Sequence, residues 1–400
     1  MITRKKLIGF LVILLSFSFL SVVSGQELRQ EGKYWIGEIK KNFKVDKTGT
    51  LVMDEIRGSV TIRTWEKNEV LIKEEKRMDI FSKNEAEIAM EKSESGYRKE
   101  GDRIIVSGEG FNRSWIQSNF DITLPAGFSC DIESEGGNID ISGLKGDVDA
   151  ATGGGSVVLA DIESNVDIST GGGSVSVKNV GGNIDISTGG GSVNVSGSGK
   201  NVDISTGGGS VVVKGVTGDN VDISTGGGSI TVSDSKGELD LSTGGGTISI
   251  DHVDAEIDAS TGGGGIEVND IEGKLDVSTG GGEIDLTRIK GAISASTGGG
   301  DVSAEVTLTD FSVDHSVQLS TGGGDIKLGI PAKLPATIDA KIEYEMRHGR
   351  EYKIDSDFPL KISEDESFGR KTIWGKGEIN GGGDLIKLRT GGGDIIIKKR

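Results

Sequence analysis

The sequence predicts an all-β protein, a right-handed parallel β-solenoid with coils of about 18 residues. Two observations support this prediction. The tetrapeptide Thr-Gly-Gly-Gly recurs from Thr152 to Thr297 at intervals of 18 residues, with a single interval of 19, and two later copies begin at Thr321 and Thr390. Around each copy, apolar residues alternate with polar ones, as in a strand with one buried face. A fixed period of this kind is the signature of a repeat architecture.

Each coil is expected to contain two similar nine-residue halves, each a strand followed by a turn. In one coil, Val202 and Ile204 precede the glycines, and Val211 and Val213 follow nine residues later. One such unit cannot bury its apolar face alone, but stacked units can, if every strand pairs in parallel with its equivalent in the next coil. The apolar positions are not spaced by six residues, which argues against a left-handed hexapeptide helix.

The triple glycines are predicted to be structural turns. At a corner where coils stack, a Cβ atom has no room, and glycine also permits a positive φ. A phosphate-binding loop is excluded, because the nearest segment, residues 194–201, has Asn at both the first glycine and the Ser/Thr position of that motif. The turn residues assigned in this way are Gly171, Gly172, Gly173, Gly189, Gly190, Gly191, Gly207, Gly208, Gly209, Gly226, Gly227 and Gly228.

Residues 1–25 are predicted to be a signal peptide. Three basic residues, at positions 4–6, precede an apolar run over 7–23, and small residues follow at a plausible cleavage site. The alternative is an uncleaved membrane anchor, since about 17 apolar residues lie at the lower limit for spanning a bilayer. With cleavage, we expect export to the periplasm, the cell surface or the medium, and no membrane insertion of the mature chain.

Residues 26–127 are predicted to form a β-rich N-terminal cap with one short helix. This region lacks the triple glycine and holds several alternating segments, while Ser82 and Glu85 form a capping box at the start of the helix. The cap is expected to cover the first coil of the repeat, residues 128–328, because an open solenoid end is a reactive strand edge.

Residues 329–400 are predicted to hold an insertion and a closing coil. The repeat stops after Leu328, and residues 329–379 contain three of the four prolines and several aromatic residues. The triple glycine then resumes, and the chain ends in three basic residues that would blunt an exposed strand edge.

The order of these segments resembles the bacterial putative-adhesin family, a domain of unknown function with β-strand repeats. The stretches that carry the resemblance are GSVTIRTWEKNEVLI at 58–72, FDITLPAGFSCDIESEGGNIDI at 120–141 and GDIIIKK at 393–399. These motifs are architectural and include no catalytic signature. The resemblance implies an exported, solenoid-like protein with an adhesive role.

The acidic composition and the single cysteine limit the possible partners and cross-links. The formal net charge of −18 disfavours nucleic acid and anionic lipid, and suits cations or basic partners. Cys130 has no cysteine in the chain with which to form a disulfide. It alternates with Phe128 and Ile132, so we expect it in the core.

A column of aspartates, each three residues before the threonine of its coil, is the candidate binding site. Flanked by inward residues, these side chains should point outward and stack. Either they form a solvated face, or they form a stripe that binds a ligand or, weakly, Ca²⁺; no other cofactor is predicted. The calcium β-roll motif places its Asp in the turn, whereas here the turn is Gly-Gly-Gly-Ser. The candidates are Asp167, Asp185, Asp203, Asp222, Asp240, Asp258 and Asp276.

The chain is not expected to be an enzyme. Its histidines, at 252, 315 and 348, are scattered, and no metalloprotease or serine-hydrolase motif is present. A polysaccharide-cleaving β-helix is disfavoured, since residues 136–328 hold a single arginine, Arg288, and turns too short to wall a cleft. Two functions stay open: an adhesin-like acidic face for a surface glycan or protein, or a structural or envelope-sensing periplasmic module. The oligomeric state is not predicted.

Overall fold

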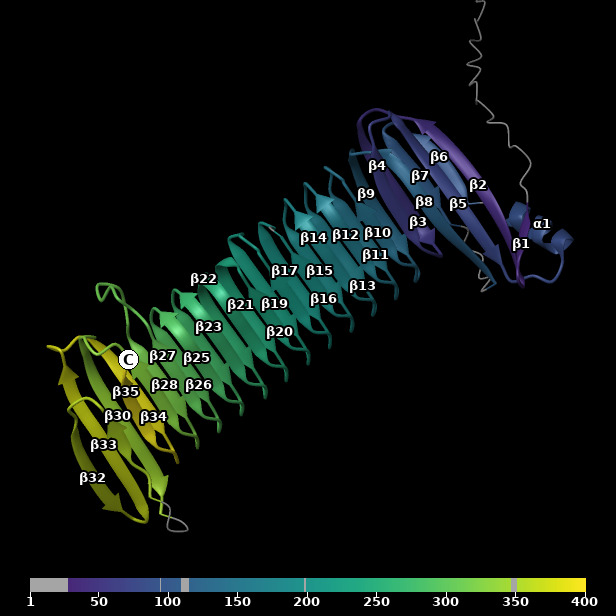
Figure 1. Cartoon of the computed structure of the whole chain (residues 1–400). Helices are drawn as coiled ribbons and strands as arrows, with labels where there is room; N and C mark the ends of the chain where they lie inside the picture. Colours follow the sequence, from purple (N-terminus) through teal and green to yellow (C-terminus); the bar gives the residue numbers. More distant parts are fainter. Residues whose placement is uncertain (1–27, 94, 109–114, 198, 347–350) are drawn as a thin grey trace, which may run out of the picture.

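The computed structural model describes residues 28–93, 95–108, 115–197, 199–346 and 351–400, so the predicted signal peptide lies outside the described residues. These residues form a long rod of stacked strands, with the two terminal regions at opposite ends (Figure 1). The predicted all-β solenoid is confirmed. Nowhere along the described part of the chain is a helix long and apolar enough to cross a membrane.

Each coil of the rod contributes one strand to each of two parallel sheets. The strand that precedes the triple glycine belongs to sheet A, and the strand that follows it belongs to sheet B. Sheet A contains, in stacking order, β9 (Gly127–Ser134), β11 (Val148–Thr152), β13 (Val166–Thr170), β15 (Ile184–Thr188), β17 (Asn201–Thr206), β19 (Asn220–Thr225), β21 (Lys236–Thr243), the second half of β22 (Ile248–Thr261), β24 (Leu275–Thr279), β26 (Ile293–Thr297) and β28 (Val317–Thr321).

Sheet B is built in the same way on the other side of the core. It contains β10 (Ile139–Ser142), β12 (Val157–Ile162), β14 (Val175–Val180), β16 (Val193–Ser196), β18 (Val211–Lys214), β20 (Ile230–Ser233), the first half of β22, β23 (Ile266–Glu272), β25 (Ile284–Lys290), β27 (Val302–Val306) and β29 (Ile326–Ile330). The register is regular: Ile184 pairs with Val202 and Thr188 with Thr206, so equivalent residues stack directly.

The core is one continuous apolar column between the two sheets. Val202, Ile204, Val211 and Val213 are all buried, as the alternation predicts, and so is Val216 beside the second corner. Because every coil places an apolar residue at the same inward positions, each layer covers the apolar surface of its neighbours. Cys130 lies in this core, and burial, followed by the charge of Asp131, raises the pKa of its thiol to about 12.

At the N-terminal end the layers do not follow the order of the chain. β3 (Thr48–Ile56) and β4 (Val60–Trp65) pair in parallel with β9 and β10 on one side. On their other side they pair with β7 (Arg103–Ser107) and β8 (Ile116–Pro125). The coil stack therefore includes residues that precede 128. Antiparallel strands close the end: β6 (Gly96–Glu100) on β7, then β5 (Glu69–Met78), β2 (Tyr34–Lys44) and β1 (Arg29–Glu31) in succession beyond β8.

The single helix of the described residues, α1 (Lys83–Lys92), packs beside this cap. The Ser82 side chain accepts a hydrogen bond of 3.3 Å from the backbone N–H of Glu85, which satisfies one of the free donors at the start of the helix. Ala86, Ala89 and Met90 are buried against the cap.

The C-terminal end repeats the inverted order. β34 (Asp384–Thr390) and β35 (Ile395–Lys399) stack on β28 and β29. β30 (Ala336–Glu345) and β31 (Ile354–Ser356), which precede them in the chain, form the next layer outward. β33 (Arg370–Ile379) and β32 (Lys361–Ser367) extend β30 as an antiparallel sheet. The last coil of the chain is thus not the outermost layer but lies between two others.

Candidate functional site

The aspartates singled out from the sequence form one row on the outer surface of sheet A. The strand register places each carboxylate next to its equivalent in the adjacent coil, and all of these residues are exposed. The row is longer than the candidate set. It runs through Asp131, Asp149, Asp167, Asp185, Asp203, Asp222, Asp240, Asp258 and Asp276. It ends where Val52 pairs with Asp131 and Ser294 pairs with Asp276. Sequence reasoning missed Asp131 because its coil has Ser134 in place of the marker threonine.

Four carboxyl groups of the row have raised pKa values. Partial withdrawal of water from the carboxyl, followed by the charges of adjacent aspartates, raises the pKa of Asp149, Asp185 and Asp222. The pKa of Asp258 is raised by the same two causes. The ionised row therefore opposes folding, and a cation beside it would relieve the repulsion.

A tight metal site is not formed by this geometry. Within the described ranges, no group of three His, Cys, Asp or Glu side chains is placed to hold a metal ion. Neighbouring carboxylates on a flat strand face supply few oxygens, whereas Ca²⁺ takes six to eight.

A second polar row, which the sequence analysis did not identify, follows the corner before each sheet A strand. It consists of Asp147, Asn165, Asn183 and Asn201. The Asp147 carboxylate accepts from the backbone N–H of Asn165 at 3.1 Å. The Asn165 and Asn183 side-chain oxygens accept from the N–H of the next member at 3.0 and 3.3 Å. The signal was present in the sequence, because these residues also recur every 18 positions.

A shallow groove of about 570 Å³ lies between the two rows. One side is lined by the aspartates from Asp131 to Asp203 and the other by the row from Asp147 to Asn201. Outward-facing serines, among them Ser187, Ser205 and Ser224, form a third row beyond the aspartates. We call this surface the acidic face. Its carboxylate and amide oxygens can accept hydrogen bonds, and its amide N–H groups and hydroxyls can donate them.

The threonine of the repeat has a structural role that the sequence analysis also missed. Thr206 is buried, and its hydroxyl donates to the carbonyl oxygen of Gly191 in the preceding coil at 3.1 Å. The same hydroxyl accepts from the N–H of Gly209 at 3.2 Å. Each threonine thus closes its own turn and ties it to the coil below. Ser134 makes the equivalent contacts in the first such turn, with Gly58 and Gly137.

The predicted reason for the triple glycine is correct in part and wrong in part. A Cβ atom on Gly207 would lie 2.2 Å from the Gly189 carbonyl oxygen, and one on Gly209 would lie 1.9 Å from that of Gly191. The first and third glycines are therefore required by close stacking. Around Gly208 no heavy atom lies within 4 Å of the added Cβ, so the crowding expected there is wrong. The same correction applies to the middle glycines Gly172, Gly190 and Gly227.

The predicted positive φ is also misplaced. No glycine of a Thr-Gly-Gly-Gly turn has φ in the left-handed region. Left-handed residues occur instead near the second corner, within the last part of the sheet B segments or directly after them. There, non-glycine residues have φ between 52° and 56°: Asp161, Asn179, Asp234, His252, Asp270 and Arg288. Asn and Asp tolerate this conformation better than most residues. Gly197 and Gly215 take the same place in intervening coils.

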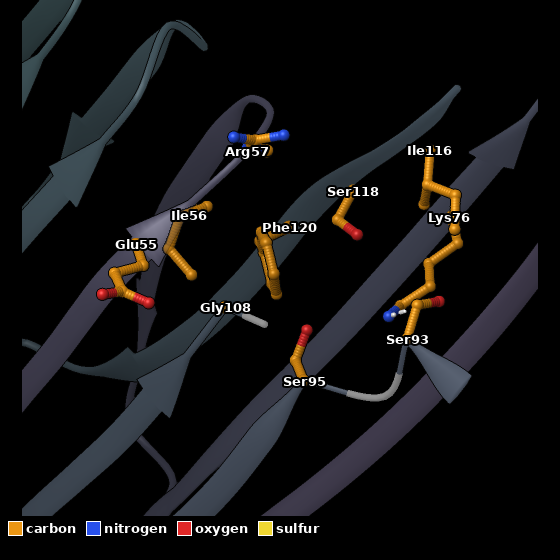
Figure 2. A pocket seen from close by; sticks show the side chains of 10 residues that line it. All are labelled: Glu55, Ile56, Arg57, Lys76, Ser93, Ser95, Gly108, Ile116, Ser118 and Phe120. Atoms are coloured by element: carbon orange, nitrogen blue, oxygen red, sulfur yellow. Dashed lines mark hydrogen bonds between the residues drawn. The ribbon is translucent and has the colours of Figure 1, made fainter. Parts of the chain in front are cut away.

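A small cavity of about 50 Å³ lies in the N-terminal cap (Figure 2). Its wall includes Lys76, whose side chain reaches toward Ser93 at the end of α1 and lies 3.4 Å from the Glu74 carboxylate. Both side chains are buried, although the alternation of β5 calls for apolar residues there. Ser95 at 2.9 Å and Tyr97 also donate to Glu74, so the buried carboxylate is satisfied within the cap.

No known family profile matches the chain, and no curated protein matches it. Among the solved structures that resemble it are the following two. One is a putative adhesin from Bacteroides fragilis, with 14% identity over 58% of this chain and 96% of that one, at a TM-score of 0.34. The other is a putative cell adhesion protein from Clostridium sporogenes, with 10% identity over 91% of this chain and 99% of that one, at a TM-score of 0.17. Both are named for a role in cell adhesion, as is the family that the sequence motifs resemble.

Proposed function

We propose that the protein is an exported, adhesin-like, non-enzymatic rod whose acidic face binds a surface glycan or protein. The observation that supports this proposal is the uninterrupted alignment of the aspartate row with the serine and asparagine rows over successive coils of sheet A. The outward positions of sheet B are mixed in comparison: Val212, Thr231, Ser249, Glu267 and Asp285 follow one another. Of these two outward surfaces, the acidic face offers the same groups in successive coils.

A repeated face suits a repeated partner. Equivalent side chains recur about every 4.8 Å along the rod, the spacing of adjacent strands. A glycan or extended protein with hydroxyl, ammonium or guanidinium groups can make one weak contact per coil. Several weak contacts on one rigid frame give a much stronger association than any one of them. The negative charge would also speed the encounter with a cationic partner.

The alternative is a structural or envelope-sensing module in which the rod is a spacer and the ends make the contacts. The hairpin of β32 and β33 supports this alternative. Phe368 in its turn is fully exposed, and Ile362 on β32 is half exposed. A large exposed aromatic side chain at the tip of a rod is a plausible anchor for a partner.

The two functions are separated by a binding assay with matched variants. Purified mature protein is incubated with cells and with immobilised surface glycans. The acidic-face variant Asp203→Asn with Asp222→Asn is compared with the sheet B variant Glu267→Gln with Asp285→Asn, which also neutralises two stacked carboxylates. The proposal requires a loss of binding in the first variant alone. Equal losses would indicate a nonspecific charge effect, and a loss in Phe368→Ser alone would support the alternative.

A further inference from the structure

The coil before the C-terminal layers contains a six-residue insertion. Thr297 and Thr321 are 24 residues apart, whereas most neighbouring repeats are 18 apart. The extra residues lie between β27 and β28, in the segment 307–316, which we call the clip segment. It reaches the two layers that are stacked out of chain order. Its partners are Pro335, just before β30, and Asp384, the first residue of β34.

His315 makes the contacts that hold the clip segment in place. Its side chain is only 5% exposed. Nδ1 lies 2.9 Å from the Val313 carbonyl oxygen and 3.1 Å from the Asp384 carboxylate, and Nε2 lies 2.9 Å from the Pro335 carbonyl oxygen. The His315 backbone N–H also donates to Asp384 at 3.0 Å. Both ring nitrogens therefore face oxygen acceptors.

Only the protonated ring fits these surroundings. A neutral imidazole carries one N–H donor and one lone pair, whereas the imidazolium donates from both nitrogens. With the proton on Nε2 alone, the Nδ1 lone pair would face the Val313 oxygen and the Asp384 carboxylate. With the proton on Nδ1 alone, the Nε2 lone pair would face the Pro335 oxygen. Either neutral form places two acceptors about 3 Å apart around a ring that is only 5% exposed.

We propose that His315 is a proton-operated latch that joins the clip segment to the C-terminal layers of the rod. The protonated latch fastens Asp384 and Pro335 to the last regular coil. Loss of the proton releases the clip segment and loosens β30 and β34, while the rest of the rod stays folded. The latch makes the C-terminal end, which carries the exposed Phe368, responsive to pH near neutrality.

The charged groups around the ring favour the protonated form. Burial opposes protonation, but the carbonyl oxygens of Val313 and Pro335 and the carboxylates of Asp384 and Asp314 outweigh it and raise the pKa of His315 above 6.5. Asp314 lies on the clip segment itself, and hydrogen bonds from Ser316 lower its pKa, as does the more distant charge of Lys274. The 331–335 side contributes the Pro335 carbonyl oxygen to the ring, and Lys333 in this segment is exposed.

The direction of the pH effect follows from this shift. A group whose pKa is higher in the folded state than in the released state stabilises the fold fully at pH values below its pKa in the released state. That stabilisation is lost as the pH rises through the pKa of the group in the folded state. One proton is involved, so the opening equilibrium of the clip segment can change by up to tenfold per pH unit in that interval.

Hydrogen exchange with mass spectrometry, corrected for the intrinsic pH dependence of exchange, tests the latch between pH 5.5 and 8.5. In wild type, protection of the clip segment and of β34 should fall at least tenfold as the pH rises, while β15 and β17 keep theirs. His315→Gln should show low protection at every pH. His252→Gln, which changes an exposed histidine elsewhere on the rod, should behave as wild type.

A second measurement keeps the proposal testable if His315→Gln fails to fold. The ring of His315 is titrated by NMR in the wild-type protein, with the three histidine signals assigned by single substitution. A midpoint above 6.5 that decreases in Asp384→Asn supports the latch. A midpoint at or below 6.5, or pH-dependent protection that persists in His315→Gln, overturns it.

Discussion

The turn geometry predicts opposite outcomes for the same mutation at adjacent residues. Gly209→Ala and Gly208→Ala each add one methyl group to the same Thr-Gly-Gly-Gly turn. The new Cβ would lie 1.9 Å from the Gly191 carbonyl oxygen at position 209 but would meet no heavy atom within 4 Å at position 208. Position 208 also lacks a left-handed φ, so alanine can adopt its backbone conformation.

The cost at position 209 can be worked out from the contacts that must break. The Gly191 oxygen has to move by about 1.1 Å to reach the 3.0 Å that real Cβ contacts require. The same oxygen accepts the 3.1 Å hydrogen bond from Thr206, which a shift of that size takes out of range. Leaving a buried hydroxyl without its acceptor costs about 1–3 kcal/mol, and weakening the neighbouring bond from Gly207 to Thr188 adds about 1 kcal/mol. We expect a loss of about 2–4 kcal/mol.

Gly208→Ala should change the free energy of unfolding by no more than about 0.5 kcal/mol, as for other exposed substitutions. Urea denaturation followed by circular dichroism measures both variants. Because long repeat arrays can unfold in parts, the slope of the transition is compared with wild type before free energies are extracted. Equal losses in the two variants, or a larger loss at position 208, would refute the assignment of the crowded positions.

Four further predictions follow, three from the structure and the last from the sequence. Thr206→Val should lower the free energy of unfolding by about 1–3 kcal/mol, because it leaves the Gly191 carbonyl oxygen and the Gly209 N–H without their partner in the interior. Thr206→Ser keeps the hydroxyl and should retain most of the stability in the same urea assay. Replacing Asp203, Asp222 and Asp240 with Asn should preserve or raise the melting temperature at pH 7, most clearly at low salt. Because the pKa of Asp222 is raised in the folded protein, ionisation of its carboxyl group lowers the stability of wild type as the pH rises from 3.8. The gain in melting temperature should therefore vanish below pH 3.8. If the aspartate row instead binds cations, millimolar Ca²⁺ would raise the melting temperature of wild type and not of this triple variant. Deleting residues 226–243, one complete coil, should give a folded, shorter rod with unchanged circular dichroism per residue. Thr225 then precedes Gly244, so the stacking register of the remaining coils is kept. Aggregation of this variant would contradict the view that each coil is a separate unit that can be removed. Finally, N-terminal sequencing of exported protein should begin near Gln26, and recovery of the full-length chain in membranes would favour an anchor.

The regular part of the rod was predictable because one rule determines it. The alternation of Val202, Ile204, Val211 and Val213 specifies both strands of a coil, and the 18-residue period specifies their pairing. The outward aspartate row follows from the same alternation. For these elements, local pattern and tertiary packing give the same answer.

The parts that could not be predicted depend on contacts between coils. Nothing in the local sequence shows that the Thr206 hydroxyl reaches the preceding coil, or that Gly209 rather than Gly208 is crowded. The order of layers at the ends is likewise set by which strands meet in space. β34 lies between β28 and β30 because it pairs with both, a fact that no periodicity of residues 329–400 expresses.

The inverted order of the C-terminal layers makes the docking of β30 depend on strands that follow it in the chain. During synthesis or export, each regular coil can stack as soon as it emerges, because its partner has already formed. β30 cannot do so, since the layer that joins it to the rod, β34 and β35, follows it in the chain and emerges later. A chain truncated before residue 384 would leave β28 and β29 as open edges and β30 without its inner neighbour. A fragment without β34 and β35 would therefore expose strand edges that favour aggregation, whereas a chain that contains them covers those edges.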